Sequence, residues 1–554
     1  MLRQCIPSAA SGRTLARRAS CPVFVLGAAL WLTGCGPGGP LRCHLNPDVQ
    51  RPSPGVVIFL ADGLPPGLVE QGCAEGWLPN IQKRFFEGGA HVRRAASTVP
   101  SITYAAVASM FTGVLPEQHQ VVGNRWFDPE QALFRNYVKI AYYDAINADC
   151  TRPTIYERLQ PAACANIQTA LRRGVTYNIA NWAVSGMLWF FWDFTAVDKL
   201  SVSSTGEVVG WANSQRHWPT ILTYYFPALD TVGHRFGPGS PRYDRAIRHV
   251  DYQIGRVCDW LEHEGLLKTT YIVLLSDHGM IAVQPGGHVD TLTLVRDTWG
   301  RKATDHVEQG DPRWLRQAYY DDFDTIVNDL DGRCTSLHIR SCAGWQVRPT
   351  PAEVLTVIEA PPPKAQLWNI PGVELAAYLV ADDDLLLRSG PRQARIRTRA
   401  GPNGTEYAYV PVPDDVLGYV GDPDLARFVS AGYHDSRAWL HATADQRLPD
   451  LVPPLMSLLH ARRAGQVVLF AQPGYSFGAE RGGHGGIDRD ERLMTFALAG
   501  PGITPGTVID TARAVDVTPT LLDLLGVVHD TGEFEGVSLV DAGLLSAEVG
   551  RPAE

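Results

Sequence analysis

Seven side chains with oxygen or nitrogen donor atoms occur in five short segments that lie far apart in the chain. The segments read FLADG, PSITY, DTVGH, SDHGM and GGHGG. Their candidate metal ligands are Asp62, Thr103, Asp230, His234, Asp277, His278 and His484. Carboxylate oxygen and imidazole nitrogen bind divalent metals, and two such ions can stabilise both the attacking and the leaving oxygen of a phosphoryl transfer. The residue types therefore predict a metal-dependent phosphoesterase with two Zn²⁺ ions, and manganese, iron or cobalt would also suit such a site.

Four continuous apolar runs are typical of buried parallel strands. They cover residues 55–60, 221–226, 271–276 and 493–500. Helical patterns at 104–111 and 243–264 lie between them, so the alternation predicts an α/β sheet with helices on both faces. Asp62, Asp230 and Asp277 each follow the carboxyl end of a run. Open α/β sheets bind ligands at that edge, so we expect one shared site there.

Each segment alone also has a simpler interpretation. An aspartate after a strand, such as Asp62, is most often a turn or helix-cap residue. Asp277 is more specific, because it and the next residue reach one pocket only through a tight turn, which Gly279 permits. His484 stands between glycines, where the backbone can approach a ligand closely or form an exposed loop. The functional interpretation depends on all the segments together.

Thr103 stands before an apolar helical stretch, where its hydroxyl would cap the helix N-terminus. The same position lies in the positive potential of the helix dipole and beside unpaired backbone N–H groups. That potential favours both an alkoxide and the phosphate it attacks. The two roles are compatible, so Thr103 is also the candidate nucleophile.

The order and wording of these segments resemble the alkaline phosphatase superfamily, in particular its nucleotide pyrophosphatase/phosphodiesterase branch. The likeness is strongest in SITYAAVASMFTGVLPEQHQVVGN, where Thr103 stands nine residues before the threonine of the step Thr112-Gly113. It covers about 55–130, 220–290 and 465–542 and fades elsewhere. The resemblance implies an alkaline-phosphatase-like α/β sandwich with a mostly parallel central sheet, helices on both faces and an inserted smaller lobe.

The resemblance also implies a role for each candidate residue. One zinc ion would be held by Asp230, His234 and His484, and the other by Asp62, Asp277, His278 and the Thr103 oxygen. Thr103 would attack phosphorus in the first of two displacements and form a phospho-threonine, while Asn124 would bind a phosphate oxygen. The chain is thus expected to be a hydrolase of phosphodiester or pyrophosphate bonds.

Departures from the family pattern leave the substrate open. Ile102 replaces the usual lysine before the nucleophile. A phosphomonoesterase needs an added cation for its doubly charged phosphoryl group, and Arg125, beside Asn124, is the local candidate. Arg125 has an equally good interpretation as a surface residue that flanks Trp126. We expect Asn124, Arg125 and Trp126 to contact the substrate.

A diesterase needs an apolar slot for the second ester group. Aromatic side chains close enough in sequence to contribute are Tyr104, Phe111, Trp126 and Phe127. We favour a small phosphodiester or nucleotide over a monoester. The alternatives are a phosphomonoesterase, a phospho-headgroup transferase and a surface lipoprotein that only binds its ligand. The last predicts damaged ligands, whereas all seven are present.

The N-terminal segment predicts export. Basic residues precede the apolar run 23–32, and no acidic residue occurs before Asp48. The run closes on Leu-Thr-Gly-Cys, which resembles the lipobox of bacterial lipoproteins. We therefore expect lipidation of Cys35 and attachment to the periplasmic or cell-surface face of a bacterial membrane, with the outer membrane favoured. An ordinary secretory signal is the alternative.

The predicted domains follow from these features. They are a lipoprotein signal peptide at 1–34, a tether at 35–52, a catalytic core at 53–290 and 461–545, an inserted lobe at 291–460 and a tail at 546–554. The net charge of −9 and the lack of a basic stripe argue against a nucleic-acid duplex as partner.

Seven cysteines follow Cys35. Close spacing suits disulfides in an oxidising compartment. The candidate pairs are Cys150 with Cys164, Cys334 with Cys342 and, as a third, Cys43 with Cys73. Cys258 lies in a helical pattern, which predicts a buried free thiol.

Overall fold

The computed structural model describes residues 39–139, 142–180, 194–305, 312–402 and 404–545. The predicted signal peptide, the lipidation residue Cys35 and the predicted tail at 546–554 lie outside the described residues. Within the described part, no helix is both long and apolar enough to cross a membrane.

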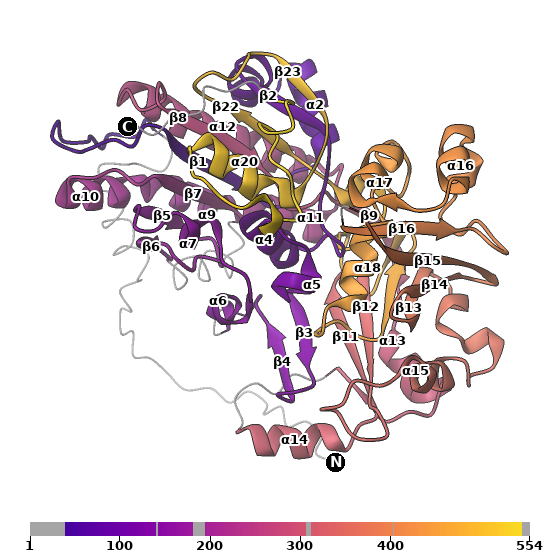
Figure 1. The fold of residues 1–554 in the computed structure, drawn as a ribbon. Helices are drawn as coiled ribbons and strands as arrows, with labels where there is room; N and C mark the ends of the chain where they lie inside the picture. Colours follow the sequence, from indigo (N-terminus) through magenta and orange to yellow (C-terminus); the bar gives the residue numbers. More distant parts are fainter. Residues whose placement is uncertain (1–38, 140–141, 181–193, 306–311, 403, 546–554) are drawn as a thin grey trace, which may run out of the picture.

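A nine-stranded, mostly parallel sheet forms the centre of the molecule (Figure 1). The described strands follow the order β21, β2, β22, β8, β1, β7, β5 and β6, and β23 pairs with β2. Their bounds are β1 (Gly55–Ala61), β2 (Ala90–Ala96), β5 (Cys164–Ile167), β6 (Tyr177–Ile179), β7 (Ile221–Phe226), β8 (Thr270–Leu275), β21 (Leu493–Met494), β22 (Phe496–Ala499) and β23 (Thr507–Arg513). β1 runs parallel to β7 and β8, and β5 runs parallel to β6 and β7. The predicted α/β fold with a mostly parallel central sheet is confirmed.

Three of the four apolar runs form the expected strands, and the fourth differs. β1, β7 and β8 coincide closely with the runs that begin at residues 55, 221 and 271. The run at 493–500 instead divides into β21 and β22, and β22 pairs antiparallel with β8. A strand buried on both faces is apolar throughout whichever way it runs, so the pattern does not reveal strand direction.

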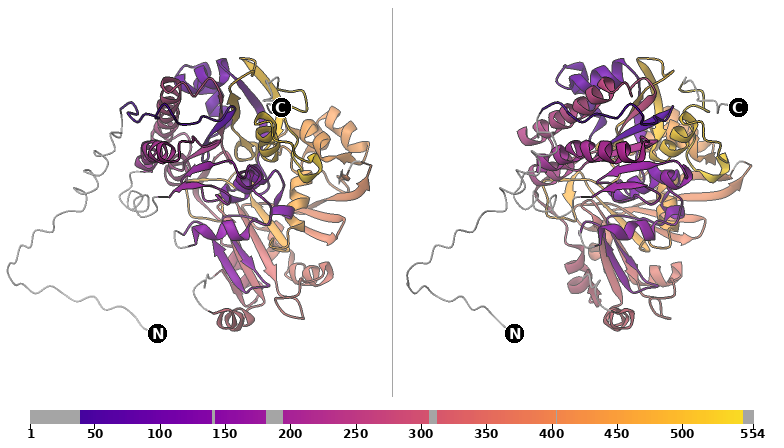
Figure 2. Two further views of the ribbon diagram at one scale, coloured as in Figure 1. Left: turned by 60° about the vertical axis from the view of Figure 1, so that its left-hand side comes forward. Right: turned by 90° about the vertical axis from the view of Figure 1, so that its left-hand side faces the viewer.

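Helices cover both faces of the central sheet (Figure 2). Along β1, Val56, Ile58 and Leu60 pack into one buried cluster, whereas Val57 and Phe59 pack into another. Side chains of a strand alternate between the two faces, so one strand serves two cores. Helices of the first cluster include α4 (Thr103–Thr112) and α20 (Val517–Leu524), and those of the second include α2 (Pro66–Ala74), α9 (Phe194–Ser203), α10 (Thr205–Gln215), α11 (Ala228–Phe236) and α12 (Pro241–His263).

A second nine-stranded sheet forms the inserted lobe beside the central sheet (Figure 1, pink to orange). In spatial order its described strands are β10 (Ala303–Thr304), β11 (Thr325–Asp331), β12 (Cys334–Ile339), β18 (Val467–Ala471), β13 (Val373–Ala381), β14 (Asp384–Ser389), β15 (Arg392–Gly401), β16 (Gly404–Val410) and β17 (His434–Asp435). Its helices include α14 (Arg313–Asp321), α15 (Pro351–Ile358), α16 (Pro423–Ser430), α17 (Ser436–Thr443) and α18 (Val452–His460). β18 lies beyond residue 460, where the insertion was expected to end, yet it occupies the middle of this sheet.

Two small sheets and several short helices complete the described chain. The sheets pair β9 (Ile281–His288) with β19 (Gly474–Ser476) and β20 (Gly482–Gly483), and β3 (Arg125–Asp128) with β4 (Leu133–Asn136). The short helices include α3 (Pro79–Ile81), α5 (Pro116–His119), α6 (Ile146–Asp149), α7 (Ile155–Arg158), α13 (Thr291–Thr293) and α19 (Arg489–Arg492).

A fully buried arginine joins the lobe to the core. The Arg333 guanidinium donates from Nε to Glu491 Oε2 at 2.9 Å and from its other nitrogens to the carbonyls of Ala471, Gln472 and Tyr475. Glu491 also accepts from the amides of Gly486 at 2.9 Å and Asp488 at 3.2 Å. The pair therefore fixes the loop between β20 and α19 against the β11–β12 turn.

The segment expected to be a tether is packed from Gly39 onward. Leu41, Leu45 and Val49 are buried, and Trp260 on α12 donates its indole N–H to the Cys43 carbonyl at 2.7 Å. The glycine- and proline-rich composition suggested flexibility, but the apolar side chains that follow it pack into the same buried cluster as residues of α12. Residues 39–52 are therefore packed against the core, and a tether stays a prediction for residues 35–38, which lie outside the described part of the chain.

The structure does not form the predicted disulfides. Its free thiols include Cys73, Cys150, Cys164, Cys258, Cys334 and Cys342. Cys334 is buried at the start of the extended strand β12, whereas Cys342 is exposed beyond the end of that strand. Six strand residues span about 16 Å, and a disulfide requires Cα atoms within about 7 Å. The buried free thiol predicted for Cys258 on α12 is confirmed.

Candidate active site

Two neighbouring strands bring Asp62, Asp277 and His278 together, and we call these three the Asp62 group. β1 and β8 run side by side in parallel, so the residues that follow them meet at one edge of the sheet. One donor atom from each of the three lies within 4.8 Å of the others. Gly63 follows Asp62 with φ of +68° and donates its amide to Asp277 Oδ1 at 3.0 Å. Glycine adopts that backbone conformation without strain, which allows the close approach.

A helix and a glycine loop supply Asp230, His234 and His484, which we call the Asp230 group. Asp230 and His234 lie one turn apart on α11, and Oδ1 of Asp230 is 3.2 Å from His234 Nε2. His484 follows β20, and its Nε2 lies 3.0 Å from His234 Nε2. Its ring stacks on His278 with centroids 3.6 Å apart, so the two groups are adjacent.

The three imidazoles are held by the same kind of hydrogen bond. His234, His278 and His484 each donate Nδ1–H to a backbone carbonyl, at 2.9 to 3.1 Å. A carbonyl only accepts, so each ring carries a proton on Nδ1 and turns Nε2 toward the other donors of the site. Facing lone pairs repel unless a cation or a proton lies between them. Metal-binding histidines are fixed in this way by their other ring nitrogen.

Each of the three carboxylates has one buried oxygen without a hydrogen-bond partner. These atoms are Asp62 Oδ1, Asp230 Oδ1 and Asp277 Oδ2, and they are the oxygens that face the imidazoles. A buried carboxylate oxygen without a partner is costly. Divalent cations would satisfy these oxygens and the imidazole lone pairs together, so the donor set fits the metals expected from the sequence.

The electrostatics of the site agree with this fit. Burial and the charges of Asp277 and Asp230 raise the pKa of Asp62 well above its usual range. Burial and the His278 ring lower the pKa of His484 to about 3, so its imidazole is neutral at ordinary pH. Burial lowers the pKa of His234, but the charges of Asp230 and Glu480 outweigh it and raise that pKa well above its usual range, so a cation at the Asp230 group would compete with a proton on this ring.

Several supporting residues were not singled out from the sequence. The Tyr225 hydroxyl donates to Asp62 Oδ2, and Ser97 donates to the Asp277 carbonyl. Glu480 Oε2 lies 2.7 Å from His234 Nδ1. Tyr225 is the last residue but one of a predicted strand next to the site, and Glu480 precedes His484 by four residues. Both positions could have been flagged by proximity, although nothing in their residue type marks them.

Thr103 begins α4 at the centre of the site. The helix cap is Ile102, so the predicted N-cap role of Thr103 is wrong by one residue. Thr103 is the first helical residue and is 5% exposed, with Oγ1 3.3 Å from His278 Nε2. Since Nε2 carries the lone pair, the hydroxyl donates to it. The helix N-terminus thus directs this hydroxyl at the same edge as the carboxylates.

The three residues expected to contact substrate lie in three different environments. Asn124 is buried beside Thr103, and its Oδ1 accepts from the Tyr104 amide at 3.1 Å. Arg125 Nη1 lies 3.8 Å from Asp329 Oδ2 in the lobe. Trp126 is fully buried, donates to the Tyr137 hydroxyl at 3.0 Å and leaves no surface for substrate. Its apolar character reflects core packing, which sequence proximity to Asn124 could not distinguish.

The other aromatic residues expected to line a substrate slot differ in burial. Phe111 and Phe127 are fully buried, so they do not line an open slot. Tyr104 is half-buried. Burial, followed by the negative charges of Asp62 and Asp331, raises its pKa, which places the phenol near both the carboxylates and the lobe.

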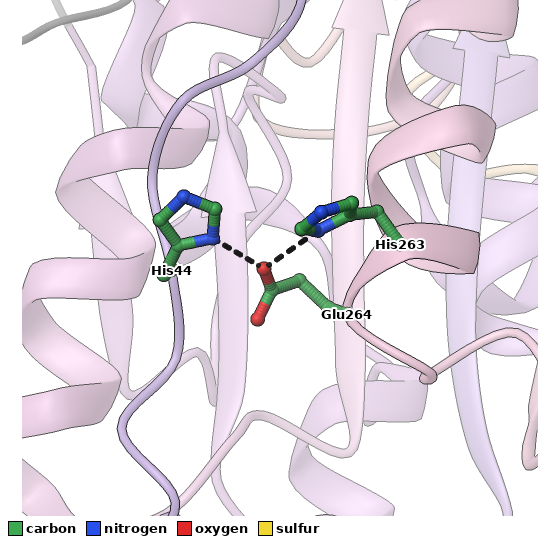
Figure 3. A group of neighbouring side chains, drawn as sticks. All are labelled: His44, His263 and Glu264. Atoms are coloured by element: carbon green, nitrogen blue, oxygen red, sulfur yellow. Dashed lines mark hydrogen bonds and ion pairs between the residues drawn. The ribbon is translucent and has the colours of Figure 1, made fainter.

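A third cluster of possible metal ligands lies apart, on the surface, and differs from the site. His44, His263 and Glu264 converge where α12 ends (Figure 3). The Glu264 Oε1 accepts from His44 Nδ1 at 2.8 Å, and its Oε2 accepts from the Leu45 amide at 3.0 Å. Both carboxylate oxygens therefore have partners, and both imidazoles are largely exposed. Hydrogen bonds account for this cluster without a metal.

All seven predicted metal ligands therefore meet at one edge of the central sheet, with a helix N-terminus beside them. The Thr103 hydroxyl lies next to the carboxylates and imidazoles, and the first turn of α4 binds the side-chain amide of Asn124. Such a site can bind divalent cations and a phosphate, and can direct an oxygen nucleophile at phosphorus. The assignment of ligands to individual ions stays a prediction.

Comparison with known proteins gives relatives that agree with this chemistry. The chain is 28% identical over 213 residues to an uncharacterized pyrophosphatase/phosphodiesterase of Schizosaccharomyces pombe, covering 37% of this chain and 41% of that one. It is 25% identical over 262 residues to venom phosphodiesterase 2 of Crotalus adamanteus, covering 46% and 30%. It is 26% identical over 232 residues to the mouse ectonucleotide pyrophosphatase/phosphodiesterase family member 1, covering 41% and 24%. The chain thus spans less than half of the length of these relatives.

Two further comparisons extend over more of the chain. The solved structure of murine ectonucleotide pyrophosphatase/phosphodiesterase 5 superposes with a TM-score of 0.56 at 15% identity, covering 89% of this chain and 100% of that one. This likeness establishes the fold alone. The family model for type I phosphodiesterase/nucleotide pyrophosphatase matches residues 56–334. The chain belongs to the type I phosphodiesterase/nucleotide pyrophosphatase family, within the alkaline phosphatase superfamily.

Proposed function

We propose that this protein is a metal-dependent phosphodiesterase or nucleotide pyrophosphatase that hydrolyses its substrate through a phospho-threonine at Thr103. Two divalent ions, zinc by preference of the donor set, would be held by the Asp62 group and the Asp230 group. The observation that carries the proposal is the convergence of three imidazole Nε2 atoms and three partnerless carboxylate oxygens around the Thr103 hydroxyl. The names of its relatives support the same reaction class.

In the proposed mechanism, bound metals supply positive charge that polarises phosphoryl oxygens and lowers the pKa of a hydroxyl. Thr103 Oγ1 gives its proton to solvent water and forms a bond to phosphorus as the bond to the leaving oxygen breaks, and the leaving oxygen takes up a proton from water. Asn124 and the Thr103 amide bind the non-bridging oxygens. A water molecule then attacks phosphorus, the bond to Thr103 breaks, and the threonine recovers a proton. Two inversions give net retention at phosphorus.

We also propose that the enzyme acts outside the cytoplasm. The basic and apolar N-terminal segment and the Leu-Thr-Gly-Cys ending at Cys35 support export as a lipoprotein, with attachment to the outer membrane favoured. Metabolic labelling with a fatty acid tests this proposal, because Cys35→Ala should abolish incorporation while Cys43→Ala should not.

The test of the reaction compares a nitrophenyl phosphodiester with the matching monoester, using the purified, zinc-loaded protein. Faster diester cleavage is expected, and Thr103→Ala should lower it at least about a thousandfold. Thr103→Ser is the matched control, because it retains the hydroxyl and should retain measurable activity. Metal content of Thr103→Ala, measured by elemental analysis, should stay near two ions per chain.

The other outcomes discriminate among the alternatives. Faster monoester cleavage would place the protein with the phosphomonoesterases. Absence of any activity dependent on Thr103, in protein that carries its metal, would refute the hydrolase and favour a transferase or a binding protein.

A further inference from the structure

The β11–β12 turn of the inserted lobe reaches the proposed active site. The Arg333 amide donates to the His484 carbonyl at 3.0 Å, which ties the turn to the loop of a predicted metal ligand. On the other side, an added Cβ on Gly123 would lie 3.2 Å from Leu330 Cβ. The absence of a side chain at Gly123 therefore lets the lobe strand approach the residue before Asn124. The turn is built against both the metal site and the phosphate site.

One side chain of this turn binds the residue expected to hold phosphate. Asn124 Nδ2 donates to Asp331 Oδ2 at 2.5 Å, while Asn124 Oδ1 accepts from the Tyr104 amide at 3.1 Å. The side-chain amide is thus held at both ends. An amide nitrogen carries two protons, so one N–H remains to bind a substrate oxygen. Asp331 therefore determines the direction in which that N–H points.

The same contact places a negative charge beside the phosphate. A substrate oxygen and the Asp331 carboxylate would both lie about 3 Å from one nitrogen, so they would be within about 6 Å of each other. The Asp331 carboxylate accepts a hydrogen bond from a neutral amide, which does not cancel its charge. Arg125, the cation expected from the sequence to favour a doubly charged phosphate, instead has Asp329 within 3.8 Å. The surroundings thus oppose a second negative charge on the substrate.

We propose that Asp331 is a positioning and specificity-determining residue, which orients Asn124 and makes the site select singly charged phosphodiesters over doubly charged phosphomonoesters. This inference rests on the proposed function. One extra unit of charge at about 6 Å in a partly solvated site changes binding by roughly tenfold to a hundredfold. That range sets the size of the effect to be measured.

Two substitutions at the same position separate the two roles. Asp331→Asn removes the charge and keeps an oxygen that accepts from Asn124, so it tests selectivity. Asp331→Ala removes both the charge and the acceptor, so it also tests the orientation of Asn124. Asp424→Asn is the matched control, because it removes one carboxylate that is 85% exposed on the lobe helix α16.

The measurement is kcat/KM for a nitrophenyl phosphodiester and its monoester at pH 8, where the monoester carries two charges. Asp331→Asn should raise the ratio of the monoester kcat/KM to the diester kcat/KM at least about tenfold, because the monoester carries one more negative charge and gains more from the loss of the carboxylate. Asp331→Ala should give a diester value about tenfold below that of Asp331→Asn, because only the alanine variant also loses the acceptor for Asn124, and Asp424→Asn should change neither substrate's value. Equal changes for both substrates, or none, in Asp331→Asn would overturn the inference.

A binding measurement distinguishes this failure from failure of the proposed function. Thr103→Ala and Thr103→Ala/Asp331→Asn are titrated calorimetrically with both compounds, so no turnover is needed. Tighter monoester binding in the double variant, at unchanged metal content and unfolding temperature, supports the role of Asp331 even if the wild type is not a hydrolase. Unchanged monoester affinity overturns it even if Thr103-dependent diester hydrolysis is found.

Discussion

The buried Arg333–Glu491 pair should make a large contribution to stability, because neither side chain has access to water. Both are 0% exposed, and the guanidinium has four hydrogen bonds. Arg333→Met keeps much of the side-chain volume but leaves the Glu491 carboxylate buried without its cation. Breaking a buried pair in this way costs about 3–5 kcal/mol. For a chain of 554 residues, that corresponds to a fall in Tm of about 3–4 °C if core and lobe unfold together.

A double-mutant cycle tests whether the cost arises from the pair itself. Glu491→Gln alone should be destabilising as well, and the double variant should lose less than the sum of the two by at least about 1 kcal/mol. Scanning calorimetry of the metal-loaded protein supplies the values. Arg427→Met, which breaks an exposed pair with Asp424, is the control and should cost about 0.5 kcal/mol or less. Additive single effects, or a Tm unchanged within 1 °C in Arg333→Met, would refute the reasoning.

Two further predictions concern protons and metals. His119 is buried, and burial lowers its pKa to about 3. Below pH 6.5 its imidazole therefore binds a proton in the unfolded chain but stays neutral in the folded chain. The free energy of unfolding should therefore decrease as the pH is lowered from 7 to 5. In urea unfolding, His119→Gln should make this decrease smaller by about 2 kcal/mol, and an equal decrease in both proteins would contradict the prediction. Removal of metal by a chelator should lower Tm, because partnerless carboxylates are left in the site. Added zinc should raise Tm again, because zinc at a hundredfold excess over Kd adds about 2.7 kcal/mol to the free energy of unfolding. No change of Tm on chelation of a demonstrably loaded sample would exclude metals from these groups.

Features set by local sequence could be predicted, whereas those set by distant packing could not. Asp62 and Asp277 were placed correctly at the sheet edge because the apolar strands before them are unambiguous. The direction of β22 escaped prediction, since burial on both faces gives the same pattern in either direction. Trp126 was expected to contact substrate because it lies near Asn124 in sequence. In the structure it is buried against Tyr137, which directly follows β4, the strand paired with β3.

The lobe explains most of the remaining differences. Its sequence resembles the family little, so neither its sheet nor the reach of its β11–β12 turn could be anticipated. Asp331 has no motif around it and becomes relevant only through contact with Asn124. The N-cap of α4 was displaced by one residue, which is within the ordinary uncertainty of helix ends.

The spacing of the imidazoles has a consequence for when the site can form. His234 and His484 meet across 250 positions of the chain, and the His484 ring bonds to Ser101 across 383. Contacts of such separation form late, after loop-closure entropy has been overcome. The lobe sheet stands between them in sequence, with β18 inserted at its middle. A metal held by these groups would therefore be acquired only by a nearly complete chain, after the lobe sheet has formed.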